Sequence, residues 1–302
     1  MMQQTTDKGA SGVMLEERIE AIPLPVSDID RAKHFYEKLG WRVDVDFHVP
    51  FVHFRTVQIT PPGSTCSIQL GTDLTKAAPG SLQSLLLVVK DIEVARTDIA
   101  QRGIDVGEVY HVELGKSPEQ GVDPDHRSYM SLADFKDPDG NGWRLQEVTQ
   151  RLPGRGGEPP ESSEQKIEAI PLPVSDLDRA KQFYAKLGWQ VDIDYIAPSG
   201  NFRIIQCTPP GSQCSIQFGG GRTTASPGSV QGLLLVVKDI EAARSELVNA
   251  GIEVGEVYHS GLKPHEPGPA LFRLSYLTYA DFKDPEGNSW RLQEITHRLP
   301  GR

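Results

Sequence analysis

The sequence contains few of the residues that hold secreted domains or zinc sites together. Only three of its 302 residues are cysteine, and none of them lies in a CxxC or CxH spacing. Such sparse cysteines predict neither a disulfide framework nor a zinc site, and they favour a reducing compartment. Two of the three, Cys66 and Cys214, lie in apolar segments and are predicted to be core residues.

Long apolar runs and clusters of positive charge are missing as well. No segment approaches the roughly 18 apolar residues of a membrane-spanning helix, and the N-terminal MMQQTTDKGASGVMLEE lacks the apolar core of a signal peptide. The formal net charge is −10 and no basic run occurs, whereas nucleic acids and anionic membranes recruit proteins through basic patches. We therefore expect a cytoplasmic protein with neither a nucleic acid nor a membrane as partner.

What the sequence does contain is a long internal repeat. The segment IEAIPLPVSDIDRAKHFYEKLGW, which begins at Ile19, restarts at Ile167 as IEAIPLPVSDLDRAKQFYAKLGW, so the period is 148 residues (167 − 19). A period of this length indicates a duplicated domain, because solenoid repeats are much shorter. The predicted division is a flexible tail at 1–17, domains at 18–153 and 167–302, and a linker at 154–166 that is rich in Pro, Gly, Glu and Ser.

Each copy divides again into two similar halves. Apolar periodicity and turn residues predict a strand, a helix and three strands, and then the same order once more. The expected elements of the first copy are a strand at 19–26, a helix capped by Ser27 or Asp28 and ending at Gly40, strands at 42–48, 54–60, 66–71 and 82–89, a helix at 92–102, and strands at 106–112, 129–135 and 141–148. The prediction is an α+β fold of four βαβββ modules, which pair to cover their exposed sheet faces and form two ligand cavities.

Strand alternation separates buried positions from ligand-facing ones. In the repeated FKDPDGNGWRLQEV, Trp143 and Leu145 point one way and are predicted to be buried, which leaves Arg144 on the opposite face. The same reasoning applied to neighbouring strands places aromatic and amide side chains on that face. The candidate ligand-binding residues are Phe54, Gln58, Gln69 and Arg144 in the first copy and Phe202, Gln206, Gln217 and Arg291 in the second. Such a face suits a small polar or planar ligand, including an anionic one.

Each of these residue types also has an ordinary structural role. Arg144 and Arg291 could instead pair with a carboxylate across the sheet, for which Asp44, Asp46 and Glu108 are candidates. The weaker catalytic candidates are a histidine and a tyrosine that recur in both copies: His111 and His259, and Tyr129 and Tyr276. A histidine can act as a base and a phenol as an acid, but a polar strand end or a strand aromatic needs no catalytic function.

Three stretches, PVSDIDRAKHFYEKLGW, VVKDIEVARTDIAQRGI and FKDPDGNGWRLQEV, resemble the vicinal oxygen chelate superfamily of glyoxalase I, bleomycin-resistance proteins and extradiol dioxygenases. The resemblance covers almost everything outside the tail and the linker. It implies two domains of the glyoxalase/bleomycin-resistance type whose halves pair within one chain, as a homodimer of single units would. A homodimer of the whole chain stays open.

The resemblance also implies where a metal-dependent member would hold a divalent ion. Those positions fall on Ala21, Gln69, Ser84 and Arg144 in the first copy and on Ala169, Gln217, Gly232 and Arg291 in the second. Ala, Ser and Gly offer no useful ligand and a guanidinium cannot bind a cation, so we expect neither a metal nor another cofactor. The expected function is a small-molecule binding protein that sequesters an antibiotic or another aromatic compound. The alternative is a glyoxalase-like lyase, isomerase or dioxygenase with a non-standard metal or a metal-free acid–base site.

Overall fold

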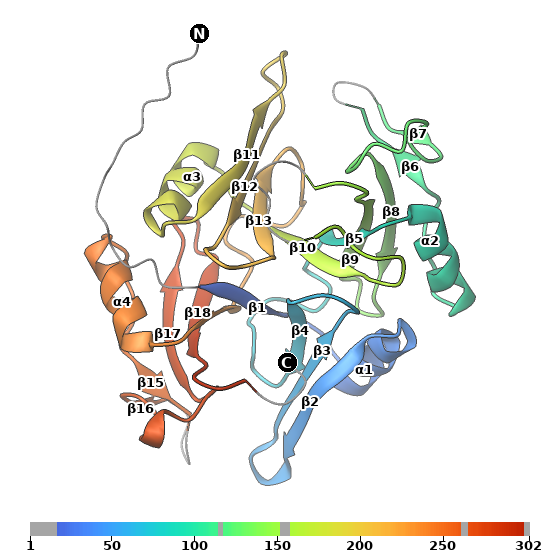
Figure 1. The fold of residues 1–302 in the computed structure, drawn as a ribbon. Coiled ribbons are helices and arrows are strands. Elements are labelled where there is room, and N and C mark those ends of the chain that lie inside the picture. Colours follow the sequence, from blue (N-terminus) through green and yellow to red (C-terminus); the bar gives the residue numbers. More distant parts are fainter. Residues whose placement is uncertain (1–16, 114–116, 152–157, 261–264, 299–302) are drawn as a thin grey trace.

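The four predicted modules are present, and their helices lie at the outer margins of the molecule (Figure 1). The computed structural model describes residues 17–113, 117–151, 158–260 and 265–298. Nearly all of the predicted tail and the first part of the predicted linker lie outside these residues. None of the described helices combines the length and the apolar character that a membrane span requires.

The first copy supplies modules 1 and 2. Module 1 consists of β1 (Arg18–Pro23), α1 (Ile29–Lys38), β2 (Arg42–Val49), the 3-10 helix η1 (Pro50–Val52), β3 (Phe54–Thr60) and β4 (Ser67–Gly71). Module 2 consists of β5 (Leu85–Val89), α2 (Ile92–Gln101), β6 (Tyr110–His111), β7 (Glu119–Gln120), β8 (Ser131–Lys136) and β9 (Gly142–Glu147). The predicted order is confirmed, but the strand expected at 106–112 is shortened to β6, which forms a small ribbon with β7.

The second copy supplies modules 3 and 4 with the same order. Module 3 consists of β10 (Lys166–Pro171), α3 (Leu177–Lys186), β11 (Gln190–Ile196), β12 (Arg203–Thr208) and β13 (Ser215–Gly219). Module 4 consists of β14 (Leu233–Val237), α4 (Ile240–Asn249), β15 (Tyr258–His259), β16 (Glu266–Pro267), η2 (Leu271–Arg273), β17 (Thr278–Lys283) and β18 (Ser289–Glu294).

Each α-helix begins at an aspartate whose side chain accepts a hydrogen bond from a backbone N–H of the first turn. In α1 this residue is Asp28, which accepts from Arg31, so of the two predicted caps Asp28 is the one used. Asp91, Asp176 and Asp239 do the same for α2, α3 and α4. Such a cap satisfies donors that the helix cannot satisfy itself and stabilises the helix by about 1 kcal/mol.

Each sheet combines one module of the first copy with one module of the second. In the described residues one nine-stranded sheet has the order β16-β15-β17-β18-β14-β1-β4-β3-β2 and joins modules 1 and 4, and we call it the 1/4 sheet. The other has the order β11-β12-β13-β10-β5-β9-β8-β6-β7, joins modules 2 and 3, and is called the 2/3 sheet. Antiparallel pairing of β1 with β14 and of β5 with β10 makes these junctions. Each sequence copy therefore contributes to both sheets.

The hydrophobic core lies between the helices and one face of each sheet. Trp143 and Leu145 are buried there, as predicted from the alternation of β9. The Trp143 ring packs edge-on against Trp41, with centroids 5.0 Å apart, and its indole N–H donates to the Tyr36 hydroxyl at 2.9 Å. That hydroxyl lies 3.1 Å from a carboxylate oxygen of Asp137. The buried polar atoms of these aromatic residues are thus hydrogen-bonded, as burial requires.

Modules 1 and 3 meet through equivalent residues of the two copies. The indole N–H of Trp41 donates to the side chain of Gln165 at 2.9 Å, and the indole N–H of Trp189 donates to the carboxylate of Glu17 at 3.2 Å. Glu17 and Gln165 occupy the same position of the repeat, but only Glu17 can ionise. Burial raises the pKa of Glu17 from its ordinary value of 4.5 to about 7.

This difference predicts a pH dependence of stability. The folded state holds the Glu17 proton up to about pH 7, whereas the unfolded chain releases it near pH 4.5, so the stability that depends on this group is present at low pH and is lost as the pH rises to about 7. We expect Glu17→Gln to remove this loss and to be more stable than the wild type at pH 8 by about 3 kcal/mol. Urea unfolding at pH 5 and pH 8 measures the effect. The matched variant Gln165→Glu should steepen the loss, and equal pH slopes for all three proteins would contradict the assignment.

Candidate functional site

The sheet faces turned away from the helices carry the polar residues singled out by the sequence. On the 1/4 sheet Gln58 lies directly opposite Gln69, and Arg291 lies on β18 beyond β1 and β14. On the 2/3 sheet Gln206 lies opposite Gln217, and Arg144 lies on β9. Neither face is built from one sequence copy alone. The junctions between β1 and β14 and between β5 and β10 group the glutamines of one copy with the arginine of the other.

Both arginines are held by an aspartate on the neighbouring strand. The Nε and Nη2 atoms of Arg144 donate to the two carboxylate oxygens of Asp134 at 2.7 and 3.1 Å. Arg291 makes the same fork with Asp281 at 2.8 and 3.3 Å. The predicted alternative of a carboxylate across the sheet is therefore confirmed.

The three residues predicted as partners of these arginines, Asp44, Asp46 and Glu108, are not the ones that pair with them. Asp46 pairs with Arg55 and Lys33 in module 1, Glu108 pairs with Arg96, and Asp44 accepts from Thr60 and Arg42. Antiparallel register decides the partner, because it places Asp134 directly opposite Arg144 and Asp281 directly opposite Arg291.

A tyrosine completes each arginine–aspartate pair. The hydroxyl of Tyr110 on β6 lies 3.0 Å from the Asp134 carboxylate, and that of Tyr258 on β15 lies 3.0 Å from the Asp281 carboxylate. Burial raises the pKa of Tyr110 to about 12 and that of Tyr258 further. Both phenols therefore keep their protons near neutral pH and act as hydrogen-bond donors.

The two glutamine pairs differ in how fully they are hydrogen-bonded. Gln217 donates to Gln206 at 2.6 Å, and Gln206 donates to Ser215 at 3.0 Å. On the 1/4 sheet Gln69 donates to Thr56 at 3.1 Å. Within the described part of the chain, the buried Nε2 of Gln58 and the buried Oε1 of Gln69 have no hydrogen-bond partner, and neither does Oε1 of Gln217. Unpartnered buried polar atoms are costly, and these three remain open to a further hydrogen bond.

The two predicted aromatic contacts are not equivalent. Phe54 begins β3, is 37% exposed, and packs edge-on against Phe47 at the end of the β2–β3 ribbon. Phe202 is half-buried, packs edge-on against Tyr195, and lies next to Gly220 in the turn after β13.

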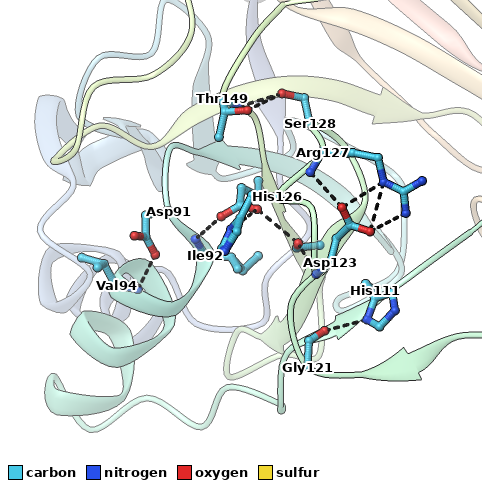
Figure 2. A network of polar contacts seen from close by, with 12 residues as sticks. Asp91, Ile92, Val94, His111, Gly121, Asp123, His126, Arg127, Ser128 and Thr149 are labelled. Carbon is cyan, nitrogen blue, oxygen red and sulfur yellow. Dashed lines mark hydrogen bonds and ion pairs between the residues drawn. The ribbon is translucent and has the colours of Figure 1, made fainter.

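Two of the weaker catalytic candidates, His111 and His259, contact backbone carbonyl groups at the edges of their modules. His111 and His259 follow the two face tyrosines by one residue, and their Nδ1 atoms lie 3.1 and 2.9 Å from the carbonyl oxygens of Gly121 and Gly268. Figure 2 shows the His111 contact beside the Asp123–Arg127 ion pair. These contacts describe a polar strand end.

Tyr129 and Tyr276 precede β8 and β17 and are not part of these strands. Their φ angles are 75° and 71°, a conformation that is unusual for bulky residues. Their carbonyl oxygens accept hydrogen bonds from Gln146 at 2.9 Å and Gln293 at 3.1 Å. The backbone of each tyrosine therefore binds a glutamine on the strand that also carries Arg144 or Arg291.

The network in Figure 2 anchors the segment before Tyr129 to helix α2. Buried Glu147 accepts from the backbone N–H of Ile92 at 3.4 Å and from Ser131 at 3.2 Å, and it lies 3.6 Å from His126. In the second copy the equivalent carboxylate is Glu294 and the residue at the histidine position is Arg273, which donates to it.

Sequence reasoning missed several residues of the two faces: Tyr110, Asp134 and Arg222 on the 2/3 sheet, and Tyr258, Tyr279 and Asp281 on the 1/4 sheet. The aspartates could have been found by counting back from the DPDG and DPEG turns, because hairpin pairing places them opposite the arginines. Tyr110 and Tyr258 are in the repeated GEVYH segment, directly before His111 and His259, which were the residues predicted as catalytic candidates.

Comparison with known proteins agrees with this architecture. The profile of the Glyoxalase/Bleomycin resistance protein/Dioxygenase superfamily matches residues 18–145 and 166–292. The chain belongs to this superfamily. Its βαβββ modules and duplicated layout are those expected from the resemblance. A search of curated protein sequences found no match for the chain.

Solved structures of the superfamily resemble the chain over most of its length. Glyoxalase I from Zea mays has a TM-score of 0.62 and 16% sequence identity, with 92% of each chain covered. A putative dioxygenase from Bacillus subtilis has a TM-score of 0.59 and 12% identity, with 94% of this chain and 87% of that chain covered. At these identities the likeness shows the fold alone. An antibiotic-binding protein from Streptomyces sp. CB03234 shares 29% identity over 42% of this chain and 93% of its own, with a TM-score of 0.34.

The residues at the superfamily's metal-ligand positions do not fit a divalent ion. The 1/4 sheet offers Ala21, Gln69, Gly232 and Arg291, and the 2/3 sheet offers Ala169, Gln217, Ser84 and Arg144. Each set supplies one amide side chain, and a guanidinium has no lone pair for a cation. In the part of the chain that the structure describes, no three His, Cys, Asp or Glu side chains gather in a metal-binding cluster.

The difference between His126 and Arg273 predicts a change in stability. An arginine stays charged, whereas a histidine pairs with a carboxylate only when protonated. We expect His126→Arg to raise the free energy of unfolding by about 0.5–1 kcal/mol, because the position is partly exposed and its partner Glu147 is buried. The reverse change, Arg273→His, should cost more, since Arg273 also pairs with Asp239 and Glu241. Urea midpoints that stay the same in both variants would contradict this account.

Proposed function

We propose that this protein binds small molecules on the helix-free faces of its two sheets without a divalent metal. The observation that carries the proposal is the set of buried amide atoms that have no hydrogen-bond partner among the described residues, Gln58 Nε2, Gln69 Oε1 and Gln217 Oε1. An uncharged donor and acceptor side by side match a polar or planar ligand.

The charged groups of each face support binding more than metal chemistry. Arg144 and Arg291 are each oriented by two hydrogen bonds to an aspartate, which leaves the remaining donor atoms of the guanidinium for a ligand. A fixed positive group at the last-strand ligand position would repel a divalent ion. Sequestration of an antibiotic or another aromatic compound is the form of binding that we favour.

The second candidate is an acid–base enzyme of the glyoxalase type. The observation in its favour is the hydrogen-bonded series of Tyr110, Asp134 and Arg144. The pKa of Tyr110, raised to about 12 by burial, makes this phenol a steady donor and a weak acid. Binding is therefore the simpler function for the same residues.

A double substitution on the 1/4 face tests the binding function. Gln58→Leu/Gln69→Leu removes the two unpartnered atoms together with the single hydrogen bond from Gln69 to Thr56, so we expect the stability without ligand to change by no more than about 1 kcal/mol. We expect compounds that raise the melting temperature of the wild type through the 1/4 face to lose this effect in the variant.

The measurement is a thermal-shift screen of antibiotics, quinones, catechols and aldehydes, run with EDTA and with added divalent metals. The comparison variant on the 2/3 face is Gln206→Leu/Gln217→Leu, which breaks the hydrogen bond between the two amides and also removes the unpartnered Gln217 Oε1. It should destabilise the protein even without ligand and leave binding at the 1/4 face unchanged. Binding that appears only with a metal, or turnover of the methylglyoxal–glutathione adduct, would contradict the proposal.

A further inference from the structure

The two faces differ at one charged position that the repeat makes directly comparable. Arg222 lies in the turn after β13, and the same position of the first copy is Leu74. A run of three glycines, 219–221, precedes Arg222, and all three have positive φ angles of 56° to 90°. The backbone N–H of Arg222 donates to the carbonyl of Gly219 at 3.1 Å, which closes a tight turn.

Arg222 belongs to the loop that follows β13 of the 2/3 sheet, and Tyr110 and Arg144 belong to β6 and β9 of the same sheet. The positive charge of Arg222 opposes the rise in the pKa of Tyr110 that burial causes, and the charge of Arg144 contributes to the lowered pKa of Arg222. Arg222 therefore lies near enough to both residues for their charges to interact.

The charges on this face of the 2/3 sheet do not balance. Asp134 offsets Arg144, whereas among the described residues no carboxylate pairs with Arg222, and its buried Nε has no hydrogen-bond partner. Burial, and then the positive charge of Arg144, lower the pKa of Arg222. A guanidinium in such a place is disfavoured unless a negative group approaches it.

On the 1/4 face the described residues show no such excess charge. Arg291 is offset by Asp281, Leu74 replaces the second arginine, and the guanidinium of Arg291 lies 5.7 Å from the centroid of the Tyr279 ring. The residue equivalent to Tyr279 on the 2/3 face is Leu132. One face therefore presents two guanidiniums to one aspartate, and the other presents a neutral ion pair with an aromatic ring.

We infer that the 2/3 face binds the anionic group of a small molecule between Arg222 and Arg144, and that the 1/4 face does not. The anionic group is a carboxylate or a phosphate, both of which accept from two guanidiniums at once. The Tyr110 hydroxyl and the amide of Gln217 are placed to contact the rest of the ligand. This inference deepens the proposed function and rests on it.

Calorimetric titration of the full chain with three probes tests the inference: benzoate, its uncharged analogue benzamide, and phenylphosphonate. We expect the anionic probes to bind at one site per chain and benzamide to bind at least tenfold more weakly. Comparison of benzoate with phenylphosphonate decides between a carboxylate and a phosphate.

Arg222→Leu copies the first-copy residue and should weaken binding of the anionic probe by about 10- to 100-fold, as expected for the loss of a charged hydrogen bond. Arg222→Lys should retain part of the affinity, because it keeps the charge without the planar fork. Leu74→Arg should add a second anion site per chain. Circular dichroism and the melting temperature establish that each variant is folded.

The inference is overturned if benzoate and phenylphosphonate bind Arg222→Leu as tightly as the wild type, if benzamide binds as tightly as benzoate, or if neither anion binds at millimolar concentration. The proposed function is unaffected by these results if neutral compounds in the thermal-shift screen still raise the melting temperature of the wild type and no longer do so in Gln58→Leu/Gln69→Leu. The proposed function itself fails if neutral compounds do not bind either face.

Discussion

The antiparallel pairing of β1 with β14 and of β5 with β10 is the constraint on which the rest of the structure depends. Each of these strands would otherwise leave its backbone N–H and C=O groups on one side unpaired, which is costly when a sheet face is covered. The pairing satisfies them and at the same time unites half of each copy in one sheet. Each face is therefore built from one module of each copy, so a substitution changes only the face to which its module belongs.

The two copies repeat each other in the core and in most polar residues of the open faces, and they differ at a few positions of those faces. Trp143 and Trp290 are each buried against a tyrosine from the helix of the other module of the same copy, because the volume and the hydrogen bonds of the core leave little freedom. On the open faces the position that is Leu74 in the first copy is Arg222 in the second, and the position that is Leu132 in the first copy is Tyr279 in the second. These side chains project from a completed sheet, so their exchange does not disturb the core.

Polar groups on the faces are held in place before any ligand arrives. In each face an aspartate accepts from an arginine and from a tyrosine hydroxyl, which fixes the directions in which the remaining donors point. A network of this kind strengthens each of its bonds in a partly buried place. This arrangement supports the proposed recognition of a ligand without a metal, because a guanidinium stands at the last-strand position where a metal ligand would be needed.

Much of the fold was accessible from the sequence, since period, turns and caps are local properties. Duplication followed from the 148-residue period, the helices from their aspartate caps, and the burial of Trp143 and Leu145 from strand alternation. The Asp134–Arg144 pair was also within reach, because hairpin register follows from the DPDG turn. What the tertiary structure alone decided is which residues share a face. Arg144 joins Gln206 and Gln217 in one sheet because strand pairing between the copies brings together residues that no local pattern connects.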